Sequence, residues 1–376
     1  MIIGIDGNEA NIVSRVGVNQ YGFELLSNLR KLQDEWKNKY KIIVYLKNEP
    51  LPDMPKESPH FTYQVLKGRE AWILQKLTPH LIFGKPKLDI FFSPSHYVPP
   101  FSPIPTVCSI MDLGYLEFSG QFKKYDFWQL KFWSAYSIFI SKAIIAISNS
   151  TKQDIVRHYP FASKKVFVTH LAYDKDRYNL RINSNDVRRV HNKYHIAKDY
   201  ILFLSTLKPS KNIEGLLAAF VMVRATFPNI SLVIAGKKGW LYEPIFKKVG
   251  ALGLTNAVIF TDFIPEKDKA PLIKGAKAFV LPSFWEGFGL DALAALACGV
   301  PVVVSDKGSL PEVVGKAGIY VDPSNVDSIA RGITKVLSLT NFEYNRLVRK
   351  GLTQARKFSW EKTARQTLKI LAGVKK

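Results

Sequence analysis

The chain has 376 residues, of which 47% are hydrophobic and 22% are charged. This balance excludes an intrinsically disordered or fibrous protein, and the length predicts two domains that each bury a core of their own. Fifty-three Lys and Arg against 31 Asp and Glu give a formal net charge of +22, which favours acidic partners such as nucleic acid, anionic lipid or phosphorylated metabolites.

In the first half of the chain, short β-rich runs alternate with helical patterns. The predicted strands are residues 2–6, 42–46, 89–93, 106–110 and 143–148. Alternation of this kind is typical of a parallel sheet covered by helices. We therefore expect an α/β fold and a Rossmann-like amino-terminal domain over residues 1–185.

The same alternation starts again after residue 200. The predicted strands are residues 201–205, 231–235, 257–261, 278–281 and 301–305. Between the two halves, residues 175–199 are polar and rich in charge, so we interpret them as a linker and expect a second Rossmann-like domain over 198–356. His191 and His195 fall in this stretch, but they lack a third ligand, and we expect no metal site.

Ligands of parallel sheets bind where the strands end, so the loops after the strands carry the chemistry. Gly17 directly precedes a predicted helix, whose first N–H groups can meet a phosphate or a sugar oxygen. Lys208 and Lys211 lie in a turn from strand to helix, and lysine is suited to neutralising phosphate oxygens. An ordinary loop glycine and ordinary surface lysines remain the alternatives at these positions.

Residues 282–290 are the most informative stretch of the sequence. A strand leads into Glu286, Gly287, Phe288 and Gly289, and a helical pattern follows. The glycines let the backbone approach a ligand, and the helix N-terminus supplies amides for an anion. A carboxylate at Glu286 would repel phosphate, so it should accept hydrogen bonds from hydroxyls. Sugar hydroxyls beside a diphosphate describe a nucleotide-sugar.

In their order along the chain, these motifs resemble the retaining GT-B glycosyltransferases of glycosyltransferase family 4. The resemblance also includes residues 89–94, 111–113, 145–148, 310–313 and 358–360. It implies two Rossmann-like domains with parallel sheets facing across a cleft. It further implies that a final helix, residues 357–376, joins the amino-terminal domain.

The resemblance implies a hexosyltransferase that moves a mannose-type or glucose-type sugar from a nucleoside-diphosphate donor to a glycan or lipid-linked acceptor. It implies retention of configuration and neither a metal nor another cofactor. The resemblance assigns catalytic roles to Glu286, Lys211 and Asp112. It assigns donor binding to Gly17, Thr206, Lys208, Phe288, Gly289 and Leu290. It places His96 and Met111 on the acceptor side.

Three departures from the family pattern bear on activity. Ala294 occupies the position of a second Glu that holds the nucleotide ribose, and Met111 stands where the family often has His. Thr206 or Ser210 replaces a frequent Arg, which leaves Lys208 as the second cation. The alternative to an active enzyme is therefore a nucleotide-sugar-binding protein that is non-catalytic or needs a partner.

Residues 121–142 form an aromatic and basic pattern at helical spacing. Such a helix can lie in the interface of an anionic membrane, although a buried core helix would show the same aromatic period. The sequence shows no nucleic-acid recognition motif, so we expect no nucleic-acid partner. It also shows no signal peptide, and its only cysteines, Cys108 and Cys298, fit a reducing compartment. We expect a cytoplasmic protein, peripheral at the inner face of the plasma membrane if the helix binds lipid.

Overall fold

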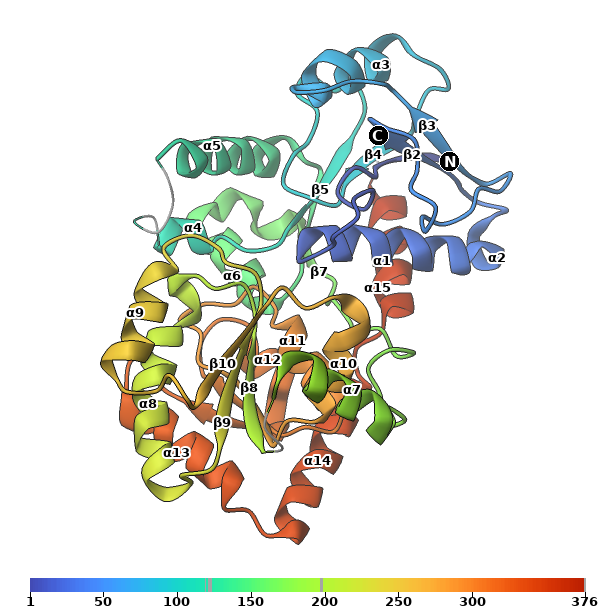
Figure 1. The fold of residues 1–376 in the computed structure, drawn as a ribbon. Coiled ribbons are helices and arrows are strands. Elements are labelled where there is room, and N and C mark those ends of the chain that lie inside the picture. The colour runs from blue at the N-terminus through green and yellow to red at the C-terminus, as the bar shows by residue number, and fades with distance from the viewer. Residues whose placement is uncertain (119, 121–123, 197–198, 375–376) are drawn as a thin grey trace. The chain divides into compact units, whose positions relative to one another are not determined.

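The computed structural model describes residues 1–118, 120, 124–196 and 199–374. Their contacts divide the chain into two units (Figure 1). Unit 1 comprises Met1–Leu171 and Ser359–Lys376, and unit 2 comprises Ala172–Phe358. Each unit contains one parallel sheet with helices, which confirms the predicted α/β class.

The described part of unit 1 builds a seven-stranded parallel sheet in the order β3-β2-β1-β4-β5-β6-β7. Every residue of β4, β5 and β6 is buried, as expected of central strands with both faces covered. The strands are β1 (Ile2–Asp6), β2 (Lys41–Leu46), β3 (Phe61–Val65), β4 (Ile90–Ser93), β5 (Thr106–Ile110), β6 (Ala143–Ala146) and β7 (Val166–Val168).

The helices of unit 1 include the last helix of the chain. They are α1 (Val18–Lys31), α2 (Gln33–Trp36), α3 (Thr78–Phe83), α4 (Gly114–Glu117), α5 (Lys124–Ile140), α6 (Asn149–His158) and α15 (Trp360–Gly373), with a π-helical turn at Ile73–Leu77. Helix α15 packs on α1, and the rings of Tyr21 and Trp360 lie 6.3 Å apart. The Thr363 hydroxyl donates to the His170 carbonyl at 2.6 Å. The end of the chain is thus an integral layer of unit 1.

The described part of unit 2 builds a six-stranded parallel sheet in the order β10-β9-β8-β11-β12-β13. Its strands are β8 (Tyr200–Leu204), β9 (Ser231–Ala235), β10 (Val258–Asp262), β11 (Ala278–Leu281), β12 (Val302–Ser305) and β13 (Gly318–Val321). Its helices are α7 (Ser184–Tyr194), α8 (Ile213–Thr226), α9 (Glu243–Ala251), α10 (Glu266–Lys274), α11 (Leu290–Ala297), α12 (Leu310–Val314), α13 (Val326–Leu337) and α14 (Asn341–Ala355).

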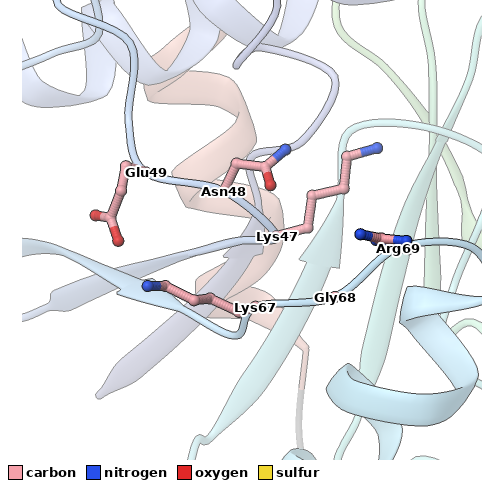
Figure 2. A pocket seen from close by; sticks show the side chains of 6 residues that line it. All are labelled: Lys47, Asn48, Glu49, Lys67, Gly68 and Arg69. Carbon is pink, nitrogen blue, oxygen red and sulfur yellow. The ribbon is translucent and has the colours of Figure 1, made fainter.

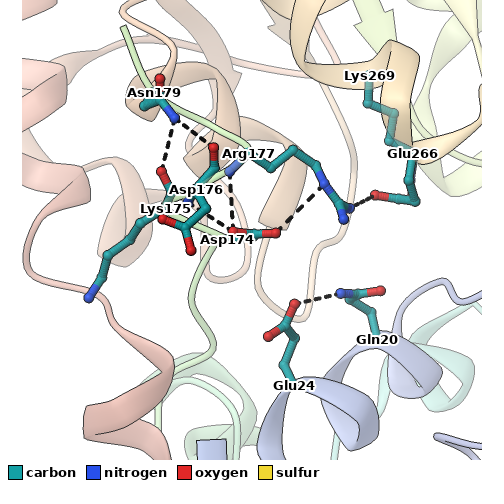
Figure 3. A network of polar contacts seen from close by, with 9 residues as sticks. All are labelled: Gln20, Glu24, Asp174, Lys175, Asp176, Arg177, Asn179, Glu266 and Lys269. Atoms are coloured by element: carbon teal, nitrogen blue, oxygen red, sulfur yellow. Dashed lines mark hydrogen bonds and ion pairs between the residues drawn. The ribbon is translucent and has the colours of Figure 1, made fainter. Parts of the chain in front are cut away.

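The stretch interpreted as a linker packs onto unit 2. Asp268 of α10 is fully buried and accepts hydrogen bonds from Arg189 at 2.7 Å, Lys193 at 2.6 Å and Tyr194 at 3.0 Å, all on α7. Arg177 lies between Asp174 and Glu266 and pairs with both (Figure 3). Residues 172–185, expected in the amino-terminal domain, are grouped by their contacts with unit 2, and Arg177 connects them to α10 through its ion pair with Glu266.

None of the described helices combines the length and the apolar character needed to cross a membrane. Helix α5 begins at Lys124 and lies within the predicted aromatic helix. Phe122 and Lys123, which belong to that predicted helix, lie outside the described residues.

Candidate functional site

The strand order of unit 2 reverses between the neighbouring strands β8 and β11. The loops that follow these two strands therefore start side by side at the carboxyl edge of the sheet and lead away in opposite directions. In doubly wound sheets this switch point is where ligands bind. The loops are residues 205–212 and 282–289, the two stretches singled out from the sequence. They are joined by hydrogen bonds: Phe284 N–H donates to the Ser210 carbonyl at 2.9 Å, and Asn212 Nδ2 donates to the Pro282 carbonyl at 3.1 Å.

Lys211 and Glu286 form an ion pair at this switch point. Each side chain is only 10% exposed, and the Ser283 hydroxyl donates to the same carboxylate oxygen, Oε1, at 2.9 Å. The lysine ammonium has three N–H donors, so pairing with Glu286 leaves donors for an anion. The structure therefore brings together the two residues that the sequence assigned to diphosphate and to sugar hydroxyls.

The backbone around Glu286 is held by the loop that follows β12. Ser309 donates to the Glu286 carbonyl through its amide at 3.1 Å and through its hydroxyl at 3.0 Å. Gly308, at φ +60°, approaches so closely that a Cβ there would lie 2.6 Å from this oxygen. The carboxylate thus projects from a backbone that is fixed on both sides.

Helix α11 begins at Leu290, and Gly289 is its N-cap residue. Gly289 has a φ of +90°, and a Cβ on it would lie 2.6 Å from Cδ2 of Leu310. A side chain is therefore excluded by conformation and by space. Phe288 is 3% exposed and packs its ring edge-on against Phe358 at 5.7 Å, so the ring belongs to the core of unit 2.

Lys208 and Thr206 lie in the first of the two loops. The Lys208 ammonium is 5.0 Å from the centroid of the Trp240 ring, in a cation–π arrangement with the loop after β9. Thr206 is half-buried beside Gly239, where a Cβ would lie 2.9 Å from the threonine methyl group. Lys208 is thus held by an aromatic ring, whereas Lys211 is held by a carboxylate.

Asp291 lies beside the Lys211–Glu286 pair, and the sequence analysis did not name it as a site residue. Burial raises the pKa of Asp291 to about 6; the charges of Lys269 and Lys211 lower it, and the charge of Glu286 raises it. Asp291 therefore shares the electrostatic environment of the Lys211–Glu286 pair. The sequence pattern that could have identified Asp291 is an acidic residue in the first turn of the helix that follows the glycine turn. Ala294, one turn further on, is 4% exposed within packed α11.

A second group of charges adjoins Asp291. Glu266 on α10 pairs with both Arg177 and Lys269 (Figure 3). Its charge and that of Lys269 act on the pKa of Asp291, in opposite directions. The figure also draws Gln20 of α1 in unit 1, which donates to Glu24 one turn along the same helix at 2.8 Å.

Unit 1 contains the other predicted residues. Its strand order reverses between β1 and β4, and Gly17 lies in the loop after β1, directly before α1. Gly17 has a φ of +52°, and no atom lies within 4 Å of the position that a Cβ would take. There is thus open space on the Cβ side of Gly17, and its role in donor binding stays a prediction.

His96 follows β4 on the other side of the same switch point. Burial lowers the pKa of His96 to about 4, so the imidazole is neutral near pH 7. Its Nε2 is buried and has no hydrogen-bond partner among the described residues, while its ring lies 4.0 Å from that of Tyr97. A buried polar atom without a partner is costly in a folded protein, so Nε2 is suited to meeting a ligand hydroxyl.

Met111 and Asp112 follow β5. The Met111 carbonyl accepts a hydrogen bond from the Thr151 hydroxyl at 3.1 Å. Asp112 is exposed, and its Oδ1 accepts the Gly114 N–H at 2.9 Å, next to the start of α4. The carboxylate therefore has one oxygen engaged by the local turn, and the other has no hydrogen-bond partner among the described residues. Among the described residues, no three His, Cys, Asp or Glu side chains gather as a metal site requires.

Residues 186–353 match the family model described as glycosyl transferases group 1. The matched residues lie within unit 2, which we therefore refer to as the group 1 domain. The chain is similar to an O-antigen chain mannosyltransferase B of Escherichia coli, with 35% identity over 61% of this chain and 60% of that protein. It is also similar to an MMP alpha-(1->4)-mannosyltransferase of Mycolicibacterium hassiacum, with 28% identity over 60% of this chain and 53% of that protein. The match thus spans little more than half of these relatives.

Solved structures share the whole arrangement of elements with this chain. A sucrose-phosphate synthase of Thermosynechococcus elongatus matches with a TM-score of 0.76 and 19% identity, covering 98% of both chains. The Anabaena protein HepE in complex with UDP and glucose matches with a TM-score of 0.75 and 17% identity, covering 99% of both. The group 1 domain and unit 1 together therefore have the GT-B fold.

Proposed function

We propose that the protein is a retaining hexosyltransferase that uses a nucleoside-diphosphate sugar. The buried Lys211–Glu286 pair at the switch point of the group 1 domain carries this proposal. It joins a cation for a leaving diphosphate to a carboxylate for sugar hydroxyls, in the loops where such sheets bind ligands. The similarity to mannosyltransferases supports a mannose-type donor, and the similarity to a protein bound to UDP and glucose supports a glucose-type one.

In this proposal each residue has one task. The free donors of Lys211, with Lys208, neutralise the diphosphate, and the first amides of α11 add the positive end of a helix dipole. Glu286 accepts hydrogen bonds from hydroxyls of the donor sugar. On the acceptor side, His96 Nε2 and Asp112 hold the acceptor, which is a glycan or a lipid-linked sugar.

The transfer proceeds on one face of the sugar. The bond from the anomeric carbon to the phosphate oxygen breaks, and the acceptor oxygen forms a new bond to that carbon from the same side. The acceptor proton passes to an oxygen of the departing phosphate, whose negative charge is stabilised by Lys211. The protein thus needs neither a metal nor another cofactor in this scheme.

Ala294 favours a second candidate, a protein that binds nucleotide-sugars without turnover. Loss of a charged acceptor for the ribose would weaken donor binding by about ten- to a hundredfold.

Incubation with GDP-mannose, UDP-glucose and ADP-glucose, with and without EDTA, separates the two candidates. We expect hydrolysis or transfer of at least one donor in both conditions, with the α-anomeric configuration retained by NMR. A nucleotide-induced rise in melting temperature without turnover of any donor would support the second candidate instead.

Helix α5 supports a membrane as a further partner. It exposes Tyr125, Trp128, Phe132 and Phe139 by 47 to 75%, while Ser134, Ser137 and Ile138 on another face are buried. The Trp128 and Phe132 rings stack at 5.3 Å, and the Lys131 ammonium lies 4.9 Å from the Trp128 centroid. The helix is thus a core element on one face only. We propose that its other face lies in the interface of an anionic membrane.

Co-sedimentation with vesicles tests this partner. We expect the protein to pellet with phosphatidylglycerol vesicles more than with phosphatidylcholine vesicles, and W128A/F132A to stay in solution. The matched control is Phe342→Ala, because Phe342 is 70% exposed but lies on α14 of unit 2. Equal amounts of the wild type and W128A/F132A in the pellets would exclude α5 as the membrane contact. Binding of nucleic acid is not expected, and the cytoplasmic location stays a prediction.

A further inference from the structure

Unit 1 contains a pocket of about 550 Å³ at the carboxyl ends of β2 and β3 (Figure 2). The pocket is lined by Lys47, Asn48, Glu49, Lys67, Gly68 and Arg69. Three of these side chains are cations and one is a carboxylate, and none is apolar. A pocket of this size takes a small ligand, and its lining suits an anionic group that also bears hydroxyls.

One wall of the pocket is fixed by a buried tryptophan. The Leu66 N–H donates to the Leu46 carbonyl at 2.8 Å, and the Trp72 indole N–H donates to the Leu66 carbonyl at 2.6 Å. Trp72 is 5% exposed and belongs to the core between the sheet and α3. A Cβ on Gly68 would lie 2.8 Å from Cδ1 of this indole. The loop that carries Lys67 and Arg69 therefore rests directly on the core.

The opposite wall is fixed by the loop after β1. Asn8 Oδ1 accepts the Lys47 N–H at 2.8 Å, and Asn11 Nδ2 donates to the Glu49 carbonyl at 2.9 Å. This loop ends at Gly17, the open backbone position of the switch point. The two walls are thus both anchored, and the pocket shares a sheet edge with the predicted acceptor-side residues because all strands of the sheet are parallel.

The three cations of the pocket differ in whether they already interact with carboxylates of the protein. Burial raises the pKa of both Asp6 and Glu9, and the charge of Lys47 opposes that rise in each. Lys47 therefore compensates buried carboxylates of the protein itself. Lys67 and Arg69 are exposed and form no ion pair with any residue that the structure describes. These two cations are the ones available to an external anion.

We propose that this pocket binds a phosphoryl group of the acceptor, with Arg69 gripping two of its oxygens and Lys67 adding a compact charge. The inference rests on the proposed function, since it names the class of acceptor: a phosphorylated sugar or a lipid-linked phosphate. The Glu49 carboxylate accepts a hydrogen bond from a hydroxyl on the group next to the phosphate.

Direct binding to the full chain tests the proposal without any transfer reaction. The probes are sn-glycerol 3-phosphate, followed by calorimetry at low salt, and vesicles of phosphatidylcholine with or without phosphatidic acid. The test variant is K67A/R69A. The matched control is K39A/K41A, which removes the same charge at the amino end of β2, where both lysines are exposed. We expect K67A/R69A to bind at least about tenfold more weakly than the wild type, and K39A/K41A to bind like it.

The two arms identify the source of the phosphate. Binding of glycerol 3-phosphate that depends on Lys67 and Arg69 supports a soluble phosphorylated acceptor, and dependence seen only with phosphatidic acid vesicles supports a lipid-linked one. Equal binding by K67A/R69A and K39A/K41A to both probes would overturn the proposal. The melting shift induced by GDP or UDP reports on unit 2 and should be the same in all three proteins. If the transferase proposal is wrong, the nucleotide-induced melting shift or the turnover of donors will be missing. If this inference alone is wrong, only the binding of glycerol 3-phosphate and of phosphatidic acid vesicles will fail to depend on Lys67 and Arg69.

Discussion

The buried pair of Lys211 and Glu286 makes a prediction that separates stability from activity. Removing one partner of a buried ion pair strands the other charge and costs about 3–5 kcal/mol of unfolding free energy. In Lys211→Met the Ser283 hydroxyl still donates to Glu286, so we expect the lower end, about 3 kcal/mol, and a similar cost for Glu286→Gln. In K211M/E286Q no charge is left buried, and we expect a cost of about 3 kcal/mol rather than the sum.

Urea unfolding of the four proteins at pH 7.5, followed by circular dichroism, gives the coupling free energy between the two residues. We expect about 3 kcal/mol. The matched cycle is K277M with D199N, an ion pair of 3.1 Å in the same unit whose side chains are each about half exposed, where the coupling should stay below about 1 kcal/mol. All three variants of the buried pair should lack transferase activity, including the double variant. Additive costs at Lys211 and Glu286, or a coupling no larger than that of the exposed pair, would refute the reasoning.

Two further predictions concern the framework of the group 1 domain. Burial alone would raise the pKa of Asp268, but the hydrogen bonds from Lys193, Arg189 and Tyr194 outweigh it and hold the pKa at about 2. The native carboxyl thus titrates below its unfolded value of about 3.9, so it stabilises the fold by about 2 kcal/mol above pH 4, and this is lost as the pH falls from 4 to 2. Asp268→Asn should remove that part of the pH dependence in urea unfolding curves recorded from pH 7 down to pH 2; an unchanged slope would contradict it. Gly289→Ala should cost about 1–3 kcal/mol and reduce the melting shift induced by GDP or UDP, because of the positive φ and the contact with Leu310. Gly250→Ala on α9, where a Cβ meets nothing within 4 Å, should be neutral or stabilising; equal losses in the two glycine variants would argue against a special role for Gly289.

The central strands and the edge strand β10 could be predicted from the sequence, whereas the other three edge strands could not. The runs that become β4, β5 and β11 are mainly apolar and fully buried, and their predicted bounds agree with the structure within one residue. The strands that were not predicted are β3, β7 and β13, which lie at sheet edges and are only partly buried. Partial burial removes the hydrophobic run on which the prediction depends.

The candidate site shows the same division. Lys211 and Glu286 could be found because each follows a strand, but their pairing across 75 residues depends on strand order, which periodicity does not report. The polar residues of α7 were interpreted as a linker because an ion pair and a solvated charge look alike in a sequence. The pocket of Lys67 and Arg69 was missed for a related reason: it follows β3, a strand that the sequence did not reveal.

The packing of α15 on α1 has a consequence for the order in which the protein is made. Unit 1 is interrupted by the whole of unit 2, and its last helix packs on α1, where Trp360 meets Tyr21, a residue made more than 300 positions earlier. During synthesis on the ribosome, one face of α1 therefore stays uncovered until α15 has emerged. Unit 2 is contiguous and has no such delay, so the half that is translated second is the half that can be completed first.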